Sequence, residues 1–195
     1  MDRAIKNLPN ALTLFRLVVI PFFVYLLYDP SRDMVYAATA LFVVASITDY
    51  FDGLLARYFK VVSDTGKLLD PLADKLLVMT ALVMLVSLRA DVDGAPWVPA
   101  WMVVIILARE LWVTGLRGIA ATQGMVLSAN AGGKWKNALQ IFAISCLLLH
   151  YPFKILGIVV NFEAFGTNIL AISIAFALWS GLDYTTEVLG KVKWT

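Results

Sequence analysis

Long apolar runs are the feature that most constrains how this chain can fold. Of its 195 residues, 61% are hydrophobic and 15% are charged, whereas soluble globular proteins are about 45–50% apolar and about 25% charged. The apolar residues gather in runs that approach twenty residues, which is the length a helix needs to cross the hydrocarbon core of a bilayer. The runs therefore predict an all-α, polytopic membrane protein.

The apolar periodicity divides the chain into about six predicted spans. These spans are Ala11–Tyr28, Met34–Ala56, Leu68–Leu88, Trp97–Gly118, Trp135–Tyr151 and Thr167–Leu189. The segment from Pro152 to Gly166 is apolar but short, and proline and glycine interrupt it, so it either extends the fifth span or lies along the membrane interface. No internal repeat or low-complexity stretch is evident, which favours a single domain over residues 1–195.

Basic residues are distributed unequally between the two sides of the predicted bundle. The side that holds both termini has Arg3, Lys6, Arg57, Lys60, Lys67, Arg117, Lys134, Lys136, Lys191 and Lys193. The opposite side has Arg32, Arg89 and Lys154. Because cytoplasmic loops are enriched in Lys and Arg, both termini are expected in the cytoplasm, with residues 1–10 as a juxtamembrane segment. The net charge of +2 gives no electrostatic case for nucleic-acid binding.

Four aspartates lie inside or beside these apolar runs, where charges are costly and usually functional. Asp49 and Asp52 are three residues apart at the expected cytoplasmic end of the second span, and Asp70 and Asp74 are four apart at the start of the third. Each spacing places two carboxylates on one face of a helix. The connection between the two helices is short enough to make them antiparallel neighbours, so the four carboxylates can converge.

Such a cluster is unfavourable without partners, because two carboxylates about 5–6 Å apart repel by roughly 3 kcal/mol at an effective dielectric constant near 20. Either some carboxylates are protonated or divalent cations bind between them. The available ligands are oxygens, which favour hard cations such as Mg²⁺ or Mn²⁺. Four carboxylates could hold two such ions in the arrangement used for phosphoryl displacement.

Small and basic residues between the two pairs favour a phosphate ligand. Gly53 and Ala56 allow backbone and ligand to approach closely, and Arg57 can bind phosphate through two hydrogen bonds. Gly66 lies where the amides of a helix N-terminus favour an anion. Two alternatives remain open: the aspartates are ordinary helix-end charges paired with nearby basic residues, or they line the path of a divalent-cation transporter.

The acidic segment from Asp49 to Asp74 resembles the signature of the CDP-alcohol phosphatidyltransferases at all eight fixed positions. It reads D-x2-D-G-x2-A-R-x8-G-x3-D-x3-D. Flanking segments resemble the phosphatidylglycerophosphate synthase branch of that family, so the resemblance runs from about Leu8 to about Tyr184. These segments are Asn7–Arg16, Ala108–Glu110, Gly115–Arg117 and Gly133–Lys136.

The resemblance implies a homodimer of six-helix subunits in the bacterial cell membrane, with the active site at the cytoplasmic face. The implied reaction converts CDP-diacylglycerol and sn-glycerol-3-phosphate into phosphatidylglycerophosphate and CMP. The family's motif makes Asp74 the general base and provides the ligands of two divalent cations, which are Asp49, Asp52, Asp70 and Asp74. The positions expected to bind the CDP group are Asp52, Gly53, Ala56, Arg57, Thr65 and Gly66.

Glycerol-3-phosphate needs a cationic pocket, for which the candidates are Arg109, Arg117 and Lys134. Arg109 lies within a predicted span, where an unpaired arginine costs about 2.5–3.5 kcal/mol. The adjacent Glu110 is expected to point to another helix face, so it is not the predicted partner of Arg109. The alternative interpretation of Arg117 and Lys134 is as ordinary basic residues of the cytoplasmic side.

Three residues near the start of the first span are candidates for supporting the site: Asn10, Thr13 and Arg16. Arg16 either approaches the acidic cluster or a phosphate, or extends to the membrane interface. The basic candidates favour a phosphorylated acceptor over serine, and sister enzymes that use inositol phosphate or phosphatidylglycerol remain alternatives.

Overall fold

The computed structural model describes the backbone of most of the chain and the side chains of a smaller part. The backbone ranges are 3–59, 64–89, 94–123, 131–151, 153–155 and 158–191, and the side-chain ranges are 15–48, 75–89, 94–123, 133, 135–151 and 160–191. The described residues form six helices: α1 Arg3–Tyr28, α2 Arg32–Phe59, α3 Asp64–Ser87, α4 Ala100–Thr122, α5 Ala131–Leu149 and α6 Phe162–Lys191. Each predicted span corresponds to one helix, so the all-α prediction is confirmed.

A short antiparallel hairpin separates α5 from α6. Its strands are β1 Phe153–Ile155 and β2 Ile158–Val160. The segment therefore does not extend the fifth helix, because α5 ends where His150 adopts a φ of 28°, and the following Pro152 disfavours helical geometry at the residue before it. Helix α6 begins earlier than predicted because the Asn161 side chain caps it, accepting a hydrogen bond from the Ala164 amide at 3.1 Å.

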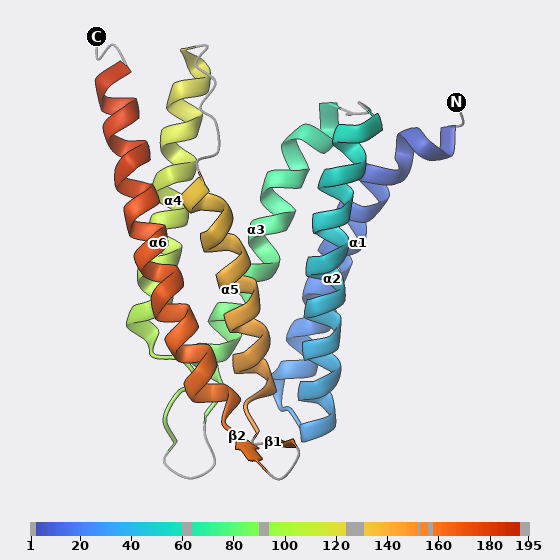
Figure 1. Cartoon of the computed structure of the whole chain (residues 1–195). Helices are drawn as coiled ribbons and strands as arrows, with labels where there is room; N and C mark the ends of the chain where they lie inside the picture. Colours follow the sequence, from blue (N-terminus) through green and yellow to red (C-terminus); the bar gives the residue numbers. More distant parts are fainter. Residues whose placement is uncertain are drawn as a thin grey trace.

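The helices alternate in direction, so both ends of the chain lie at one end of the bundle and the hairpin lies at the other (Figure 1). Helix α1 packs on α2 and α3, α5 packs on α2 and α6, and α4 packs on α6. The N-terminal part of α1 bends away from the bundle in Figure 1. This part of the helix contains Pro9, which cannot donate the helical hydrogen bond and commonly bends a helix.

The described helices have an apolar exterior, and several polar side chains lie inside. Large apolar side chains that are more than half exposed occur on all six helices, and include Val18, Phe22, Val44, Val83, Leu111, Trp112, Trp135, Trp179 and Leu182. The buried polar side chains include Arg16, Glu110, Lys136 and Gln140. By length and composition, α6 is the one helix of the described residues that is suited to crossing a bilayer, and the other apolar stretches found there are shorter.

Candidate active site

The acidic positions occupy the adjoining ends of α2 and α3. Asp49 and Asp52 lie within the last three turns of α2, and Asp70 and Asp74 lie within about the first three turns of α3. Four residues join Phe59 to Asp64, and a chain of that length spans at most about 18 Å. The backbone therefore has the helical spacing that the sequence predicts, on two consecutive antiparallel helices (Figure 1). The aspartate side chains lie outside the described part of the chain.

Several other predicted site residues have described backbones and undescribed side chains. These are Asn10 and Thr13 on α1, Gly53, Ala56 and Arg57 on α2, Thr65 and Gly66 on α3, and Lys134 on α5. Because α3 begins at Asp64, both Thr65 and Gly66 fall in its first turn, where backbone amides are free to bind an anion. Their predicted roles stay predictions. Among the side chains that are described, no three acidic, histidine or cysteine groups gather to hold a metal ion.

A cavity of about 210 Å³ lies between α3, α4, α5 and α6, close to the acidic end of α3. Four basic side chains line it among the described residues: Lys75, Arg109, Arg117 and Lys136. Glu110 is the one acidic residue among the described lining residues, so the described part of the wall has an excess of positive charge. Gly133, in the first turn of α5, brings the positive end of a helix dipole to the same space. This wall suits an anionic ligand.

Glu110 is the centre of the charged wall. Arg109 donates a hydrogen bond from Nη1 to Glu110 Oε1 at 3.0 Å, and Lys136 Nζ donates to the same oxygen. Lys75 Nζ lies 3.9 Å from Oε2, and Glu110 itself is 8% exposed. The prediction that Glu110 points away from Arg109 is therefore wrong. Adjacent helical residues leave the axis about 100° apart, but these long side chains converge because α3 and α5 supply further cations to the same carboxylate.

Arg109 is fixed by contacts with α6 as well as by Glu110. Its Nε donates to the Ala177 carbonyl at 3.0 Å, and its Nη2 donates to the Ser180 hydroxyl at 3.1 Å. Gly181 of α6 faces the Arg109 side chain, and a Cβ at that position would make an ordinary contact with Arg109 Cγ at 3.5 Å. These bonds use three of the five N–H groups of a guanidinium. Arg109 is thus an anchored cation that still lines the cavity.

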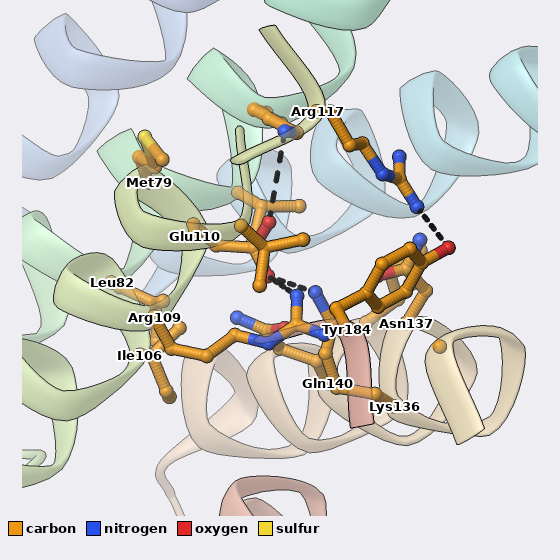
Figure 2. Close-up of a pocket in the computed structure, with 15 residues that line it drawn as sticks. Met79, Leu82, Ile106, Arg109, Glu110, Arg117, Lys136, Asn137, Gln140 and Tyr184 are labelled. Atoms are coloured by element: carbon orange, nitrogen blue, oxygen red, sulfur yellow. Dashed lines mark hydrogen bonds and ion pairs between the residues drawn. The ribbon is translucent and has the colours of Figure 1, made fainter. Parts of the chain in front are cut away.

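Arg117 pairs with Tyr184 on another side of the cavity. Its Nη2 donates to the Tyr184 hydroxyl at 2.8 Å, and the centre of the guanidinium lies 4.9 Å from the centroid of the tyrosine ring (Figure 2). Tyr184 is 2% exposed, so it is a rigid support. The structure therefore brings together two of the three predicted acceptor residues, Arg109 and Arg117, in one cavity.

The acidic end and the cavity adjoin along α3. Lys75 lines the cavity and directly follows Asp74 in the sequence. Asp70 lies about 7.5 Å before Lys75 along the helix axis, at a rise of about 1.5 Å per residue. Near the start of the bundle, the Arg16 side chain is 3% exposed, which argues against its extending to the membrane interface.

Sequence reasoning missed several residues that line the cavity: Lys75, Glu110, Lys136, Gln140 and Tyr184. Two of them carried a usable signal, because Lys75 adjoins the acidic motif and Lys136 belongs to the basic segment that begins at Gly133. Gln140 lies one turn beyond Lys136 on the same face of α5. Nothing in the local pattern around Tyr184 indicates that it supports Arg117.

Comparisons with known proteins agree with the motif and its surroundings. The family described as CDP-alcohol phosphatidyltransferase matches residues 6–179. A relative from Bacillus subtilis (strain 168), named CDP-diacylglycerol--glycerol-3-phosphate 3-phosphatidyltransferase, is 42% identical, with 93% of this chain and 94% of the relative covered. A relative of the same name from Haemophilus influenzae is 33% identical, with 95% of each chain covered. A probable phosphatidylglycerophosphate synthase from Mycobacterium tuberculosis (strain ATCC 25618 / H37Rv) is 38% identical, with 96% and 84% covered.

Proposed function

Because the chain belongs to the CDP-alcohol phosphatidyltransferase family, we propose that it transfers the phosphatidyl group of CDP-diacylglycerol to sn-glycerol-3-phosphate and releases CMP. Relatives named for this reaction are 33–42% identical over almost the whole chain. The observation that carries the choice of a phosphorylated acceptor is the cation-lined cavity beside the acidic end of α3. A neutral acceptor such as serine would leave that excess of positive charge unmatched.

Members of the family use divalent cations, and the four aspartates suit two ions such as Mg²⁺ or Mn²⁺. The fit rests on the backbone, which presents two carboxylate positions at helical spacing on each of two adjoining helix ends. The residues that would hold the ions are Asp49, Asp52, Asp70 and Asp74. When bound, such ions neutralise the diphosphate and the charge that develops on the departing CMP.

The residues of the chain have two further roles, which are proton transfer and binding of the CDP group. Asp74 accepts the proton of the attacking hydroxyl of glycerol-3-phosphate. The hydroxyl oxygen then bonds to the phosphatidyl phosphorus, and the bond from that phosphorus to the bridging oxygen breaks, so CMP leaves. None of the eight fixed positions of the motif is Ser, Cys or His, which favours this direct displacement. Residues that hold the CDP group are Asp52, Gly53, Ala56, Arg57, Thr65 and Gly66.

The acceptor phosphate binds in the cavity. Arg109, Arg117 and Lys136 line it, and Lys134 lies in the adjoining first turn of α5. Because Lys75 follows Asp74 directly, an acceptor whose phosphate lies in the cavity has its free hydroxyl within the region of the general base. The pocket thus orients a short polyol phosphate, with its charge among the cations and its nucleophile toward the aspartates.

The proposed setting is the bacterial cell membrane, with all six helices crossing it and both termini in the cytoplasm. The apolar exterior of the described helices supports a lipid environment, and the even number of helices supports termini on one side (Figure 1). The excess of Lys and Arg at that end supports its cytoplasmic location, and with it an active site at the cytoplasmic face. The family resemblance further supports a homodimer.

The direct test is CMP release by the purified protein with CDP-diacylglycerol, Mg²⁺ or Mn²⁺, and a panel of acceptors. We expect release with sn-glycerol-3-phosphate and little with serine, inositol phosphate or phosphatidylglycerol. Release with inositol phosphate alone would refute glycerol-3-phosphate as the acceptor, but it would still support phosphatidyl transfer with release of CMP. If no acceptor led to CMP release, the proposal that the protein is a phosphatidyltransferase would be refuted, and cation transport would be favoured.

The same assay tests the general base. Asp74→Asn should lower turnover by about 100-fold or more, the scale typical of lost general-base catalysis, while CDP-diacylglycerol still binds. Asp33→Asn is the matched control, because Asp33 lies in the first turn of α2 at the opposite end of the bundle. Turnover of Asp74→Asn close to that of the control would remove Asp74 from this role.

A further inference from the structure

Gln140 is a buried polar residue of the cavity that takes no part in the ion pairs around Glu110. Its side chain lines the cavity from α5 and is 3% exposed. The amide nitrogen Nε2 is fully buried and has no hydrogen-bond partner among the described residues. Native proteins pair nearly all buried donors, so an unpaired donor on a side chain that lines a cavity points to a ligand that the side chain can turn to meet.

The surroundings of Gln140 identify the chemistry of that group. Lys136 lies one turn before Gln140 on the same face of α5, and Arg109 lines the same cavity from α4 (Figure 2). Both cations already bond Glu110. Gln140 therefore adds an uncommitted donor to a wall whose charges are partly satisfied within the protein, and an anion is the ligand that suits such a wall.

The position of Gln140 along the bundle limits which part of a ligand it can contact. Gln140 lies about 10 Å deeper along α5 than Gly133, at about 1.5 Å per residue. The described lining residues also include Ile106 and Leu82, whose side chains offer no hydrogen bonds. A ligand that enters from the acidic end thus meets Gln140 with its far end, away from Asp74.

We infer that Gln140 is a specificity-determining residue that donates a hydrogen bond from Nε2 to an oxygen of the anionic group of the acceptor. The inference rests on the proposed function in taking this anion to be the phosphate of a polyol phosphate. In this arrangement the cations supply charge, and Gln140 supplies the neutral donor that closes the far end of the pocket. A carboxylate in its place would repel the same anion.

Two substitutions test this role. Gln140→Met keeps the length of the side chain and removes the donor, so the KM for sn-glycerol-3-phosphate should rise about 10-fold, the lower end expected for loss of one hydrogen bond to a charged group. Gln140→Glu keeps the shape and adds a negative charge, so the rise should be about 30-fold or more. In both variants the KM for CDP-diacylglycerol should stay unchanged. Ser145→Ala on the same helix is the control, because its hydroxyl bonds only the Ile141 carbonyl in the described structure.

A binding measurement separates this inference from the proposed reaction. Inorganic phosphate should raise the melting temperature of the wild-type protein and of Ser145→Ala in detergent, and should raise that of Gln140→Glu much less. Without phosphate, Gln140→Met should melt at or above the wild-type temperature, because it removes an unpaired buried donor. A wild-type response of Gln140→Glu to phosphate, or an unchanged acceptor KM in both variants, would overturn the role of Gln140. Failure of the wild type to release CMP, with the phosphate effect present, would count against the reaction alone.

Discussion

Helix α6 approaches the rest of the bundle at two glycines whose surroundings differ. At Gly166, near the hairpin, a Cβ would lie 2.8 Å from Leu147 Cγ and 3.1 Å from the Ala143 carbonyl oxygen of α5. At Gly181, toward the charged end, the nearest atom would be Arg109 Cγ at 3.5 Å, an ordinary contact. The first contact is between closely packed helices, and the second is between a helix and a long polar side chain.

The difference teaches that one helix serves two purposes at its two ends. Near Gly166 it fixes the packing of α5, whereas near Gly181 its Ala177 carbonyl and Ser180 hydroxyl hold a cation of the cavity. Crowding at the hairpin end should therefore change stability without changing catalysis, whereas loss of a charged cavity side chain should change catalysis. Four variants test this division, and their expected effects decrease in the order given.

Glu110→Ala should have the largest effect, because it removes the carboxylate that Arg109, Lys136 and Lys75 share. Breaking a buried ion pair by removing one partner costs about 3–5 kcal/mol, so we expect both the melting temperature and kcat/KM to fall sharply. The control is Glu187→Ala, whose exposed pair with Lys191 should contribute less than about 1 kcal/mol. Equal effects of the two substitutions in the CMP-release assay would contradict a central role for Glu110.

Arg117→Ala should raise the KM for sn-glycerol-3-phosphate about 10-fold to 100-fold, since a hydrogen bond to a charged group contributes about 1.5–3 kcal/mol. The KM for CDP-diacylglycerol should change little. Tyr184→Phe removes only the hydroxyl that positions Arg117, so its effect on the acceptor KM should be smaller. An unchanged acceptor KM in Arg117→Ala would take this residue out of the pocket.

Gly166→Ala should destabilise the protein by about 1–2 kcal/mol, because overpacking of a tight contact exceeds the better helix propensity of alanine. The nearest groups include a backbone carbonyl oxygen of α5, which cannot move away as a flexible side chain can. The measurement is thermal or denaturant unfolding in detergent, and kcat/KM of the folded enzyme should match that of the wild type. A variant as stable as the wild type would show that α5 and α6 can separate slightly without penalty.

Gly181→Ala should have the smallest effect, with stability within about 0.5 kcal/mol of wild type, since an added methyl group only reaches contact distance and alanine favours the helix. Acceptor KM should also be close to that of the wild type. A large rise in this KM would mean that even an ordinary contact from α6 displaces Arg109. Gly181 would then be as sensitive to an added methyl group as Gly166.

The parts of the molecule that could be predicted are those with local signals. The number of helices follows from apolar runs, and the placement of Asp49 to Asp74 depends on two consecutive helices and a short connection. The hairpin was missed because short apolar runs do not distinguish strand from helix. Helix faces alone do not identify Glu110 as the partner of Arg109, because side chains of α3 and α5 determine where the Glu110 carboxylate lies.

The cavity could be predicted only in part, because four helices form it and no pattern within one helix specifies their contacts. Arg109 and Arg117 were identified from their positions in α4, but their supports come from α6, nearly seventy residues later in the chain. Gln140 gives no signal in the sequence, since its importance arises from burial and from the lack of a partner in the described structure.

The adjacency of Arg109 and Glu110 has a consequence for how the chain enters the membrane during synthesis. A lone charge at the centre of a helix costs about 2.5–3.5 kcal/mol on insertion scales, and α4 is made before the α5 residue Lys136 and the α6 residue Ser180 exist. In the proposed membrane topology, these opposite charges are adjacent within α4, so they would enter lipid together and could neutralise each other before Lys136 is made. Lys136 of α5 and Ser180 of α6 then fix the final positions of these two side chains and complete the pocket.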